Sequence, residues 1–350
     1  MKALAPQYWE QRGGTRPSSV FWTAADRHYI ALRTDVKPVD TNGINAYQSA
    51  YWSYTALILN QTGTRMPLWL LRGLAGVMSN SIVRPSMIQL GQLIPWHIQR
   101  LRNSQRLRLR DLLVVDAQSP WNTDGARLPV LDAECWAFTH YLMFGEDAVH
   151  RPKLDRFVQL LNQQRDPQLA ATEAFGDIDA LEQGFVRYFD RQIFGFLQIK
   201  VDVVIKEDTF VTRALPPAEA MMARAAFHVA TRRPVEARAL IDESRKASPN
   251  LAQAYELDGL LADADRNVEG ARPAYGKAIE LGSTNFYAHF RWAALTLTEG
   301  RGRGGPDPET RARVEQALER ATSLNAQFAP AQTMLQNVRG GRGPLNPAPR

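Results

Sequence analysis

The six histidines are the residues of this chain that could hold a catalytic metal ion, and their spacing argues against such a site. They are His28, His97, His140, His150, His228 and His289. A catalytic zinc ion needs three protein ligands and an open position for water, and a common helical motif supplies two histidines as H-E-x-x-H. No histidine here is followed by glutamate, and no two are four residues apart. A site rebuilt around His97 or His140 is the remaining alternative.

Two neighbouring segments nevertheless have the form of a helix pair that could carry a metal site. Residues 51–60 read YWSYTALILN, and residues 67–76 read PLWLLRGLAG. We predict a first helix over about residues 44–60, ended by the Gln-Thr-Gly of 61–63, and a second that starts at Pro67, because proline favours the first turn of a helix.

This frame resembles the paired helices of the peptidase-MA-like gluzincins, which read roughly H-E-Y-T-H-x-L-L and then P-L-W-L-N-E-G-L-A-E. The resemblance continues through residues 90–97 and 112–120, and residues 135–145 are similar to a W-A-x-x-H-Y-L-L-x-G helix. Residues 27–33 resemble the strand that precedes the metal helix. The resemblance implies a zincin-like α+β domain over residues 1–192, shortened at its start, and we predict a strand over residues 194–205 in a connector at 193–216.

The residues that this family uses for zinc chemistry are replaced here. Trp52 stands at the first histidine, Ser53 at the glutamate base, Ala56 at the second histidine and Arg72 at the third ligand, a glutamate. None of these offers a lone pair suited to zinc, and the arginine would repel a dication. We therefore expect no catalytic residue, metal or other cofactor, and no enzyme activity. A zinc-dependent peptidase or hydrolase with a rearranged site is the alternative.

The replaced residues have two possible roles. Trp52 and Ala56 can simply pack in the former metal cavity. Arg72 can act as a fixed cation that binds carboxylate ligands, and it is a candidate interaction residue. His140 lies on a largely apolar segment, which favours a structural histidine over a ligand.

The second half of the chain contains a repeat. Ala237 and Ala271 are 34 residues apart, which is the tetratricopeptide period. We predict tetratricopeptide-like helix pairs over residues 217–250, 251–285 and 286–328, then a capping helix to 338 and a disordered tail over 339–350. Such pairs stack into an α-solenoid because no single pair can bury its apolar face.

The predicted solenoid presents a concave surface lined by the first helix of each pair. This surface either binds a protein or peptide, or only buttresses the first domain. The candidate interaction residues on it are Arg224, His228, Glu256 and His289.

Composition limits the remaining possibilities. The net charge of +6 includes an arginine run over residues 100–110, but no glycine-rich loop or interleaved aromatic residue accompanies it, so we expect no nucleic-acid partner. Cys135 is the single cysteine, which excludes an internal disulfide. No run of about 18 apolar residues could span a membrane.

Together these features predict a mostly α protein with a small β component and a non-catalytic role in binding a protein or peptide. They favour no particular oligomeric state. The first residues lack the apolar segment of a signal peptide, so we expect a cytoplasmic location, or a periplasmic or secreted one if the true start lies upstream.

Overall fold

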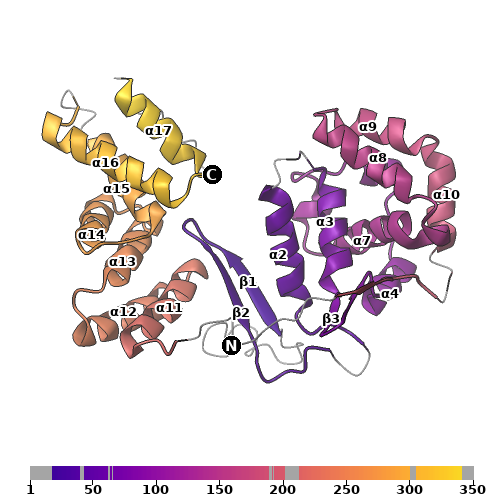
Figure 1. The fold of residues 1–350 in the computed structure, drawn as a ribbon, viewed down its shortest axis with the longest axis horizontal. Coiled ribbons are helices and arrows are strands. Elements are labelled where there is room, and N and C mark those ends of the chain that lie inside the picture. The colour runs from indigo at the N-terminus through magenta and orange to yellow at the C-terminus, as the bar shows by residue number, and fades with distance from the viewer. Residues whose placement is uncertain are drawn as a thin grey trace. The chain divides into compact units, whose positions relative to one another are not determined.

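The computed structural model describes residues 18–39, 43–61, 64, 66–188, 191, 193–201, 213–299 and 305–340. These residues are mostly helical with a few short antiparallel strands, which confirms the predicted mostly α class with a small β component. They form two compact units (Figure 1). The first contains residues 18–21 and 30–201, and the second contains residues 22–29 and 213–340.

The first unit is organised around a buried helix, α7 (Leu128–Phe144), against which α3 (Leu68–Ser79) packs. Helix α2 (Gln48–Gln61) pairs with α3. Twelve of the seventeen α7 residues are buried, which is the pattern of a helix covered on all sides. The other helices of this unit are α4 (Pro95–Asn103), α5 (Leu109–Leu112), α6 (Pro120–Thr123), η1 (Gly145–Ala148), α8 (Arg151–Asn162), α9 (Pro167–Phe175) and α10 (Ile178–Tyr188).

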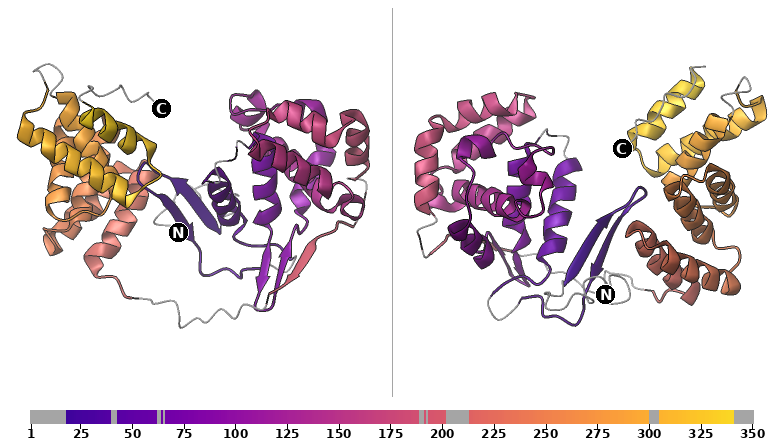
Figure 2. Two further views of the ribbon diagram at one scale, coloured as in Figure 1. Left: turned by 45° about the horizontal axis from the view of Figure 1, so that its top comes forward. Right: turned by 180° about the vertical axis from the view of Figure 1, so that it is seen from behind.

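The described strands form two small sheets. Strands β3 (Ile82–Arg84), β4 (Met87–Leu90) and β5 (Leu197–Lys200) form an antiparallel sheet with β4 in the centre (Figure 2). Strands β1 (Ser19–Thr23) and β2 (His28–Leu32) form a hairpin. The strand predicted over residues 194–205 is shorter, and residues 202–205 lie outside the described part of the chain.

A glycine permits the close packing of α3 on α7. A Cβ atom on Gly73 would lie 1.9 Å from Thr139 Oγ1 and 2.5 Å from the carbonyl oxygen of Cys135. Both distances are far below van der Waals contact, so only glycine fits without moving one helix. Beside this contact, Trp69 packs with Phe138 and Phe157 at ring-centroid distances of 5.1 and 5.6 Å.

The start of α2 is set by tertiary hydrogen bonds, which corrects the helix predicted from residue 44. Asn45 forms an antiparallel bridge with Val39, and its amide Nδ2 donates to the carbonyl oxygen of Ser81 at 2.9 Å. Its backbone nitrogen donates to Asn80 Oδ1 at 2.8 Å. Because Asn45 is held extended at the end of α3, the helix begins only at Gln48.

The second unit contains three successive helix pairs and a last helix. The pairs are α11 (Pro217–Ala230) with α12 (Pro234–Ala247), α13 (Ala252–Ala264) with α14 (Val268–Glu280), and α15 (Phe286–Glu299) with α16 (Pro308–Leu324); α17 (Ala329–Arg339) packs on α16. Arg339 was predicted in the tail but belongs to α17, where its guanidinium bonds to Glu315 and Glu319. Residues 341–350 lie outside the described chain.

Side-chain packing and hydrogen bonds join the helices within the second pair and connect this pair to the third. The ring of Tyr275 lies where a Cβ on Gly259 would be, at 2.5 Å, so the glycine admits the aromatic ring between α13 and α14. The Tyr275 hydroxyl donates to Asp263 Oδ2 at 2.9 Å. Arg291 on α15 donates to both oxygens of the same carboxylate at 2.7 and 2.6 Å. Asp263 therefore connects the second and third pairs.

No helix among the described residues is long and apolar enough to cross a bilayer.

Candidate functional site

The frame of α2 and α3 places an internally bonded cation beside Trp52. The guanidinium carbon of Arg72 lies 5.7 Å from the centroid of the Trp52 ring. Arg72 Nη1 donates to Asp132 Oδ1, and Nη2 donates to Asn122 Oδ1 at 2.8 Å. The arginine side chain is only 15% exposed. An external carboxylate would therefore have to compete with Asp132 for this cation.

The carboxyl group of Asp132, the partner of Arg72, is partly buried. Burial raises the pKa of its carboxyl group, and the Arg72 cation opposes that rise. Ser53 is partly buried and Ala56 is buried on the same helix as Trp52. Within the described residues, no group of three His, Cys, Asp or Glu side chains could hold a metal ion.

His140 lies in the core of the first unit with both ring nitrogens bonded. Its Nε2 lies 2.7 Å from the carbonyl oxygen of Gly91, and its Nδ1 lies 2.8 Å from the hydroxyl of Tyr188. A carbonyl only accepts, so Nε2 carries the proton and Nδ1 accepts from the tyrosine. Burial lowers the pKa of His140 to about 4, which keeps the ring neutral. Its lone pair is engaged and would have to leave Tyr188 to bind a metal.

His97 has a different environment. Burial and the nearby Arg100 lower its pKa to about 4. The ring of Trp136 packs against both His97 and His140, with centroid distances of 5.5 and 5.1 Å. The indole therefore contacts both imidazoles. A carboxylate often orients a metal-binding histidine through a hydrogen bond, and neither His97 nor His140 has such a bond among the residues that the structure describes.

Glu134 is a buried acid that takes no part in the frame. It is 2% exposed, and its Oε1 accepts a hydrogen bond from the backbone nitrogen of Leu107 at 2.8 Å. Burial raises its pKa to about 8, and the nearby Glu182 adds to the rise. Its other oxygen has no hydrogen-bond partner in the described part of the chain. The carboxyl group is therefore mostly protonated at neutral pH.

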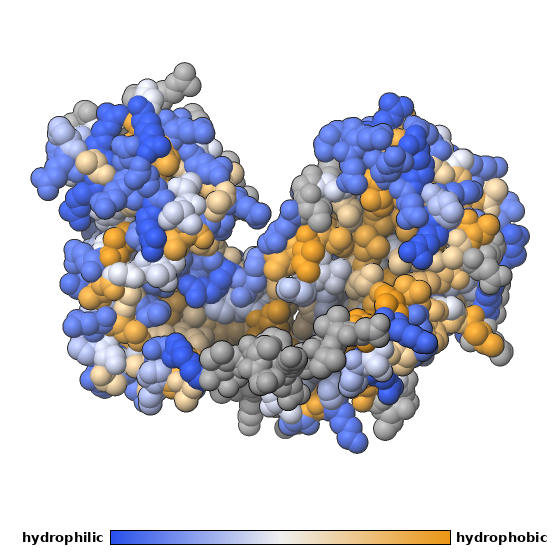
Figure 3. All heavy atoms as spheres, in the orientation of Figure 1, coloured by the Kyte–Doolittle hydropathy of each residue, from blue (hydrophilic) through white to orange (hydrophobic). Residues whose placement is uncertain are grey.

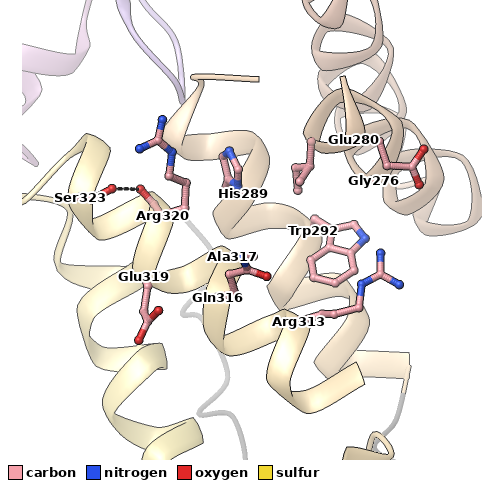
Figure 4. Close-up of a pocket in the computed structure, with 11 residues that line it drawn as sticks. Gly276, Glu280, His289, Trp292, Arg313, Gln316, Ala317, Glu319, Arg320 and Ser323 are labelled. Atoms are coloured by element: carbon pink, nitrogen blue, oxygen red, sulfur yellow. Dashed lines mark hydrogen bonds between the residues drawn. The ribbon is translucent and has the colours of Figure 1, made fainter. Parts of the chain in front are cut away.

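The second unit contains an open cavity of about 550 Å³ between α14, α15 and α16 (Figure 4). Ligand pockets usually have volumes of this size. Its wall combines an indole, a histidine, two arginines and two glutamates. The lining residues that matter for its chemistry are Glu280, His289, Trp292, Arg313, Glu319 and Arg320.

The two arginines of the cavity lack carboxylate partners among the residues that the structure describes. The guanidinium carbon of Arg313 lies 5.4 Å from the centroid of the Trp292 ring, and Figure 4 shows the two side chains next to each other. Neither Arg313 nor Arg320 forms an ion pair or a guanidinium hydrogen bond with any residue that the structure describes. They differ in this respect from Arg72.

Both glutamates of the cavity are already paired. Glu319 bonds to Arg339 on α17, and Glu280 accepts from Lys277 Nζ at 3.2 Å. Because each has its own cation, the charge of the two arginines is not cancelled within the lining.

His289 is the one predicted interaction residue that lines this cavity. Its Nε2 lies 2.9 Å from the carbonyl oxygen of Ser283, so Nε2 donates. Burial lowers the pKa of His289, and the cation of Arg320 lowers it further. The ring is therefore neutral at pH 7, and its buried Nδ1 has no partner among the described residues.

Among the other predicted interaction residues, Glu256 lies near His289, because both side chains bond to Ser283, whereas Arg224 and His228 lie on α11 and do not line the cavity. Arg224 is exposed on α11. His228 is buried, and burial and Arg233 lower its pKa. Glu256 is buried and accepts from Ser283 Oγ at 2.6 Å.

The turn between β1 and β2 covers part of this region of the second unit. Asn285 Nδ2 donates to Asp26 Oδ2 at 3.0 Å and to Glu256 Oε2 at 3.3 Å. Arg27 Nη2 lies 3.7 Å from Glu256 Oε2, and the ring of Tyr29 meets that of Phe227 edge-on at 6.3 Å. Glu256 therefore serves internal contacts rather than an open surface.

Sequence reasoning missed Trp292, Arg313 and Arg320. A signal was present, because residues 313, 316, 320 and 323 are spaced three and four apart and so lie on one helix face. All four line the cavity. The partner wall, however, comes from α14 and α15, and the sequence alone does not show which polar stripe lies beside which helix.

Comparisons with family models, with curated proteins and with solved structures found no match to this chain.

Proposed function

We propose that this chain is a non-catalytic protein- or peptide-binding protein, with a degenerate gluzincin-like domain followed by tetratricopeptide-like repeats. The observation that carries the proposal is the open cavity of about 550 Å³ in the second unit, with two arginines that lack carboxylate partners among the described residues. Unpaired guanidinium groups beside an indole are suited to binding, because they offer planar donors and a stacking surface.

The contacts of Arg72 support the non-catalytic half of the proposal. Trp52 and Arg72 stand at two positions that the resemblance assigns to zinc ligands, and they lie beside each other, with the guanidinium carbon 5.7 Å from the ring centroid. The place that a dication would need is next to an arginine that is already bonded to Asp132. A zinc ion there would meet a positive charge instead of a carboxylate.

Binding is tested by probing a peptide array with the full-length protein and then measuring the strongest peptides by isothermal titration calorimetry. We expect saturable binding of a restricted set of sequences. Absence of saturable binding to every peptide, by a protein that unfolds cooperatively, would refute the proposal.

The rival function, a hydrolase with a rearranged zinc site, is tested by metal analysis. The protein is purified without metal, reloaded with zinc and dialysed. We expect the zinc content to stay at background, and a near-stoichiometric content would overturn the non-catalytic assignment.

A further inference from the structure

We infer that the cavity between α14, α15 and α16 binds an acidic peptide segment, whose carboxylates pair with Arg313 and Arg320. This inference deepens the proposed function and rests on it. It also differs from the predicted surface, because the predicted concave face is lined by first helices, whereas α14 and α16 are the second helices of their pairs.

The first argument is the balance of charge in the cavity wall. Four formally charged residues line it, and the two glutamates are each bonded to a cation, Lys277 or Arg339. The two arginines have no such partner in the described chain. An arginine pairs best with a carboxylate through two parallel hydrogen bonds, so a ligand carboxylate would supply what the wall lacks.

The spacing of the arginines points to more than one carboxylate. Arg313 and Arg320 are seven residues apart on α16, which places their Cα atoms about 10 Å apart along the helix axis. In an extended polyproline II segment, residues three apart lie on one side and about 9 Å from each other. A segment with two acidic residues at that spacing can therefore engage both arginines.

The aromatic wall favours a peptide over a bare anion. Arg313 lies against the ring of Trp292, so its planar group is held in one orientation, and less side-chain entropy is lost when it binds. Ile279 and Ala317 add apolar lining. A side chain between the two acids would bury against this surface.

The wall also favours a peptide over inorganic phosphate. A phosphate has no apolar group to place against Trp292 and Ile279, whereas a peptide offers side chains that can pack there. Neutral His289 contributes no additional positive charge. In Figure 3, the region of α16 is mostly hydrophilic, which fits recognition through polar groups.

The experiment uses the full-length protein and fluorescence polarisation of labelled peptides. One peptide contains Glu-Ala-Phe-Glu between Gly-Ser flanks, and its matched peptide contains Gln-Ala-Phe-Gln. We expect the acidic peptide to bind at least about tenfold more tightly, because hydrogen bonds to charged groups have this magnitude. The double variant Arg313→Gln with Arg320→Gln should lose this difference.

Two further variants control the result. Arg238→Gln removes an exposed arginine of α12 that lies outside the cavity and pairs with Asp265, and it should leave the affinity unchanged. The double lysine variant, Arg313→Lys with Arg320→Lys, keeps both charges and should retain part of the affinity. Retained affinity in this variant shows that the site still folds when both arginines are replaced.

Three outcomes would overturn the inference. They are equal binding of the two peptides, undiminished binding by the double glutamine variant, and displacement of the peptide by millimolar inorganic phosphate. If peptides from the array bind but ignore Arg313 and Arg320, this inference fails while the proposed function stands. If no peptide binds at all, both fail.

Discussion

Replacing Arg72 by methionine should destabilise the first unit, because it leaves Asp132 without its cation. Removing one partner of a fully buried ion pair costs roughly 3–5 kcal/mol. Here the two side chains are 15% and 32% exposed, so solvent screens part of the loss. The variant also loses the hydrogen bond to Asn122 and the contact with the Trp52 ring. We expect a decrease of about 2–3 kcal/mol in the free energy of unfolding at pH 7.

The loss should depend on pH in a defined direction. Burial already raises the pKa of Asp132, and Arg72 opposes the rise. Without the arginine, the folded-state pKa rises further above the unfolded value of about 4. A raised folded-state pKa adds stability that is present below the unfolded pKa and is lost as pH rises through the folded one. The cost of Arg72→Met should therefore be smaller at pH 4 than at pH 7.

Urea denaturation of the full-length protein at both pH values tests this, with a matched control in the same unit. Arg110 bonds to both oxygens of Asp179, but the two side chains are 62% and 64% exposed. Arg110→Met should cost less than about 1 kcal/mol. Adding Asp132→Asn to Arg72→Met should restore most of the stability. Equal costs for the two arginines, or no recovery in the double variant, would refute the reasoning.

Three other perturbations have defined outcomes. Gly73→Ala should destabilise the first unit by about 2 kcal/mol despite its better helix propensity, since the new methyl group would overlap Thr139; thermal unfolding measures this, and Gly125→Ala, with open space around it, should be neutral. Glu134→Gln should raise the free energy of unfolding more at pH 8.5 than at pH 5, and the two gains should differ by roughly 3 kcal/mol. The reason is that the folded-state pKa of Glu134 is raised to about 8, so the wild-type protein loses stability as the pH rises towards that value. Parallel pH profiles of the wild type and the variant in urea denaturation would contradict this prediction. Introducing the gluzincin-type residues together, by Trp52→His, Ser53→Glu, Ala56→His and Arg72→Glu, should create weak zinc affinity, because the changes supply two histidines and a carboxylate and remove a cation that repels a dication; the zinc content after reloading and dialysis measures this, and a content at background would contradict it.

The local parts of the fold could be predicted because their causes lie close together in the sequence. The helix that follows Pro67 begins at Leu68, and the strand predicted at residues 27–33 is β2. His140, predicted as a structural histidine, is buried with hydrogen bonds from its ring to Gly91 and Tyr188. The error at the start of α2 arose from Asn45, whose partners Asn80 and Ser81 lie more than thirty residues away.

The sequence alone determined that the chain has no H-E-x-x-H motif, because such a motif depends on residue types at a fixed spacing along one helix, and no histidine pair of this chain has that spacing. Only the tertiary structure decided what each charged side chain does instead. Arg72 and Asp132 are sixty residues apart in the chain and bonded in space, whereas Arg313 and Arg320 line a cavity without a carboxylate partner among the described residues. The physical reason is that the partner of a charged side chain depends on which helices pack against each other. Helix packing brings together residues that are far apart in the chain, and their separation in the sequence does not indicate that they will meet.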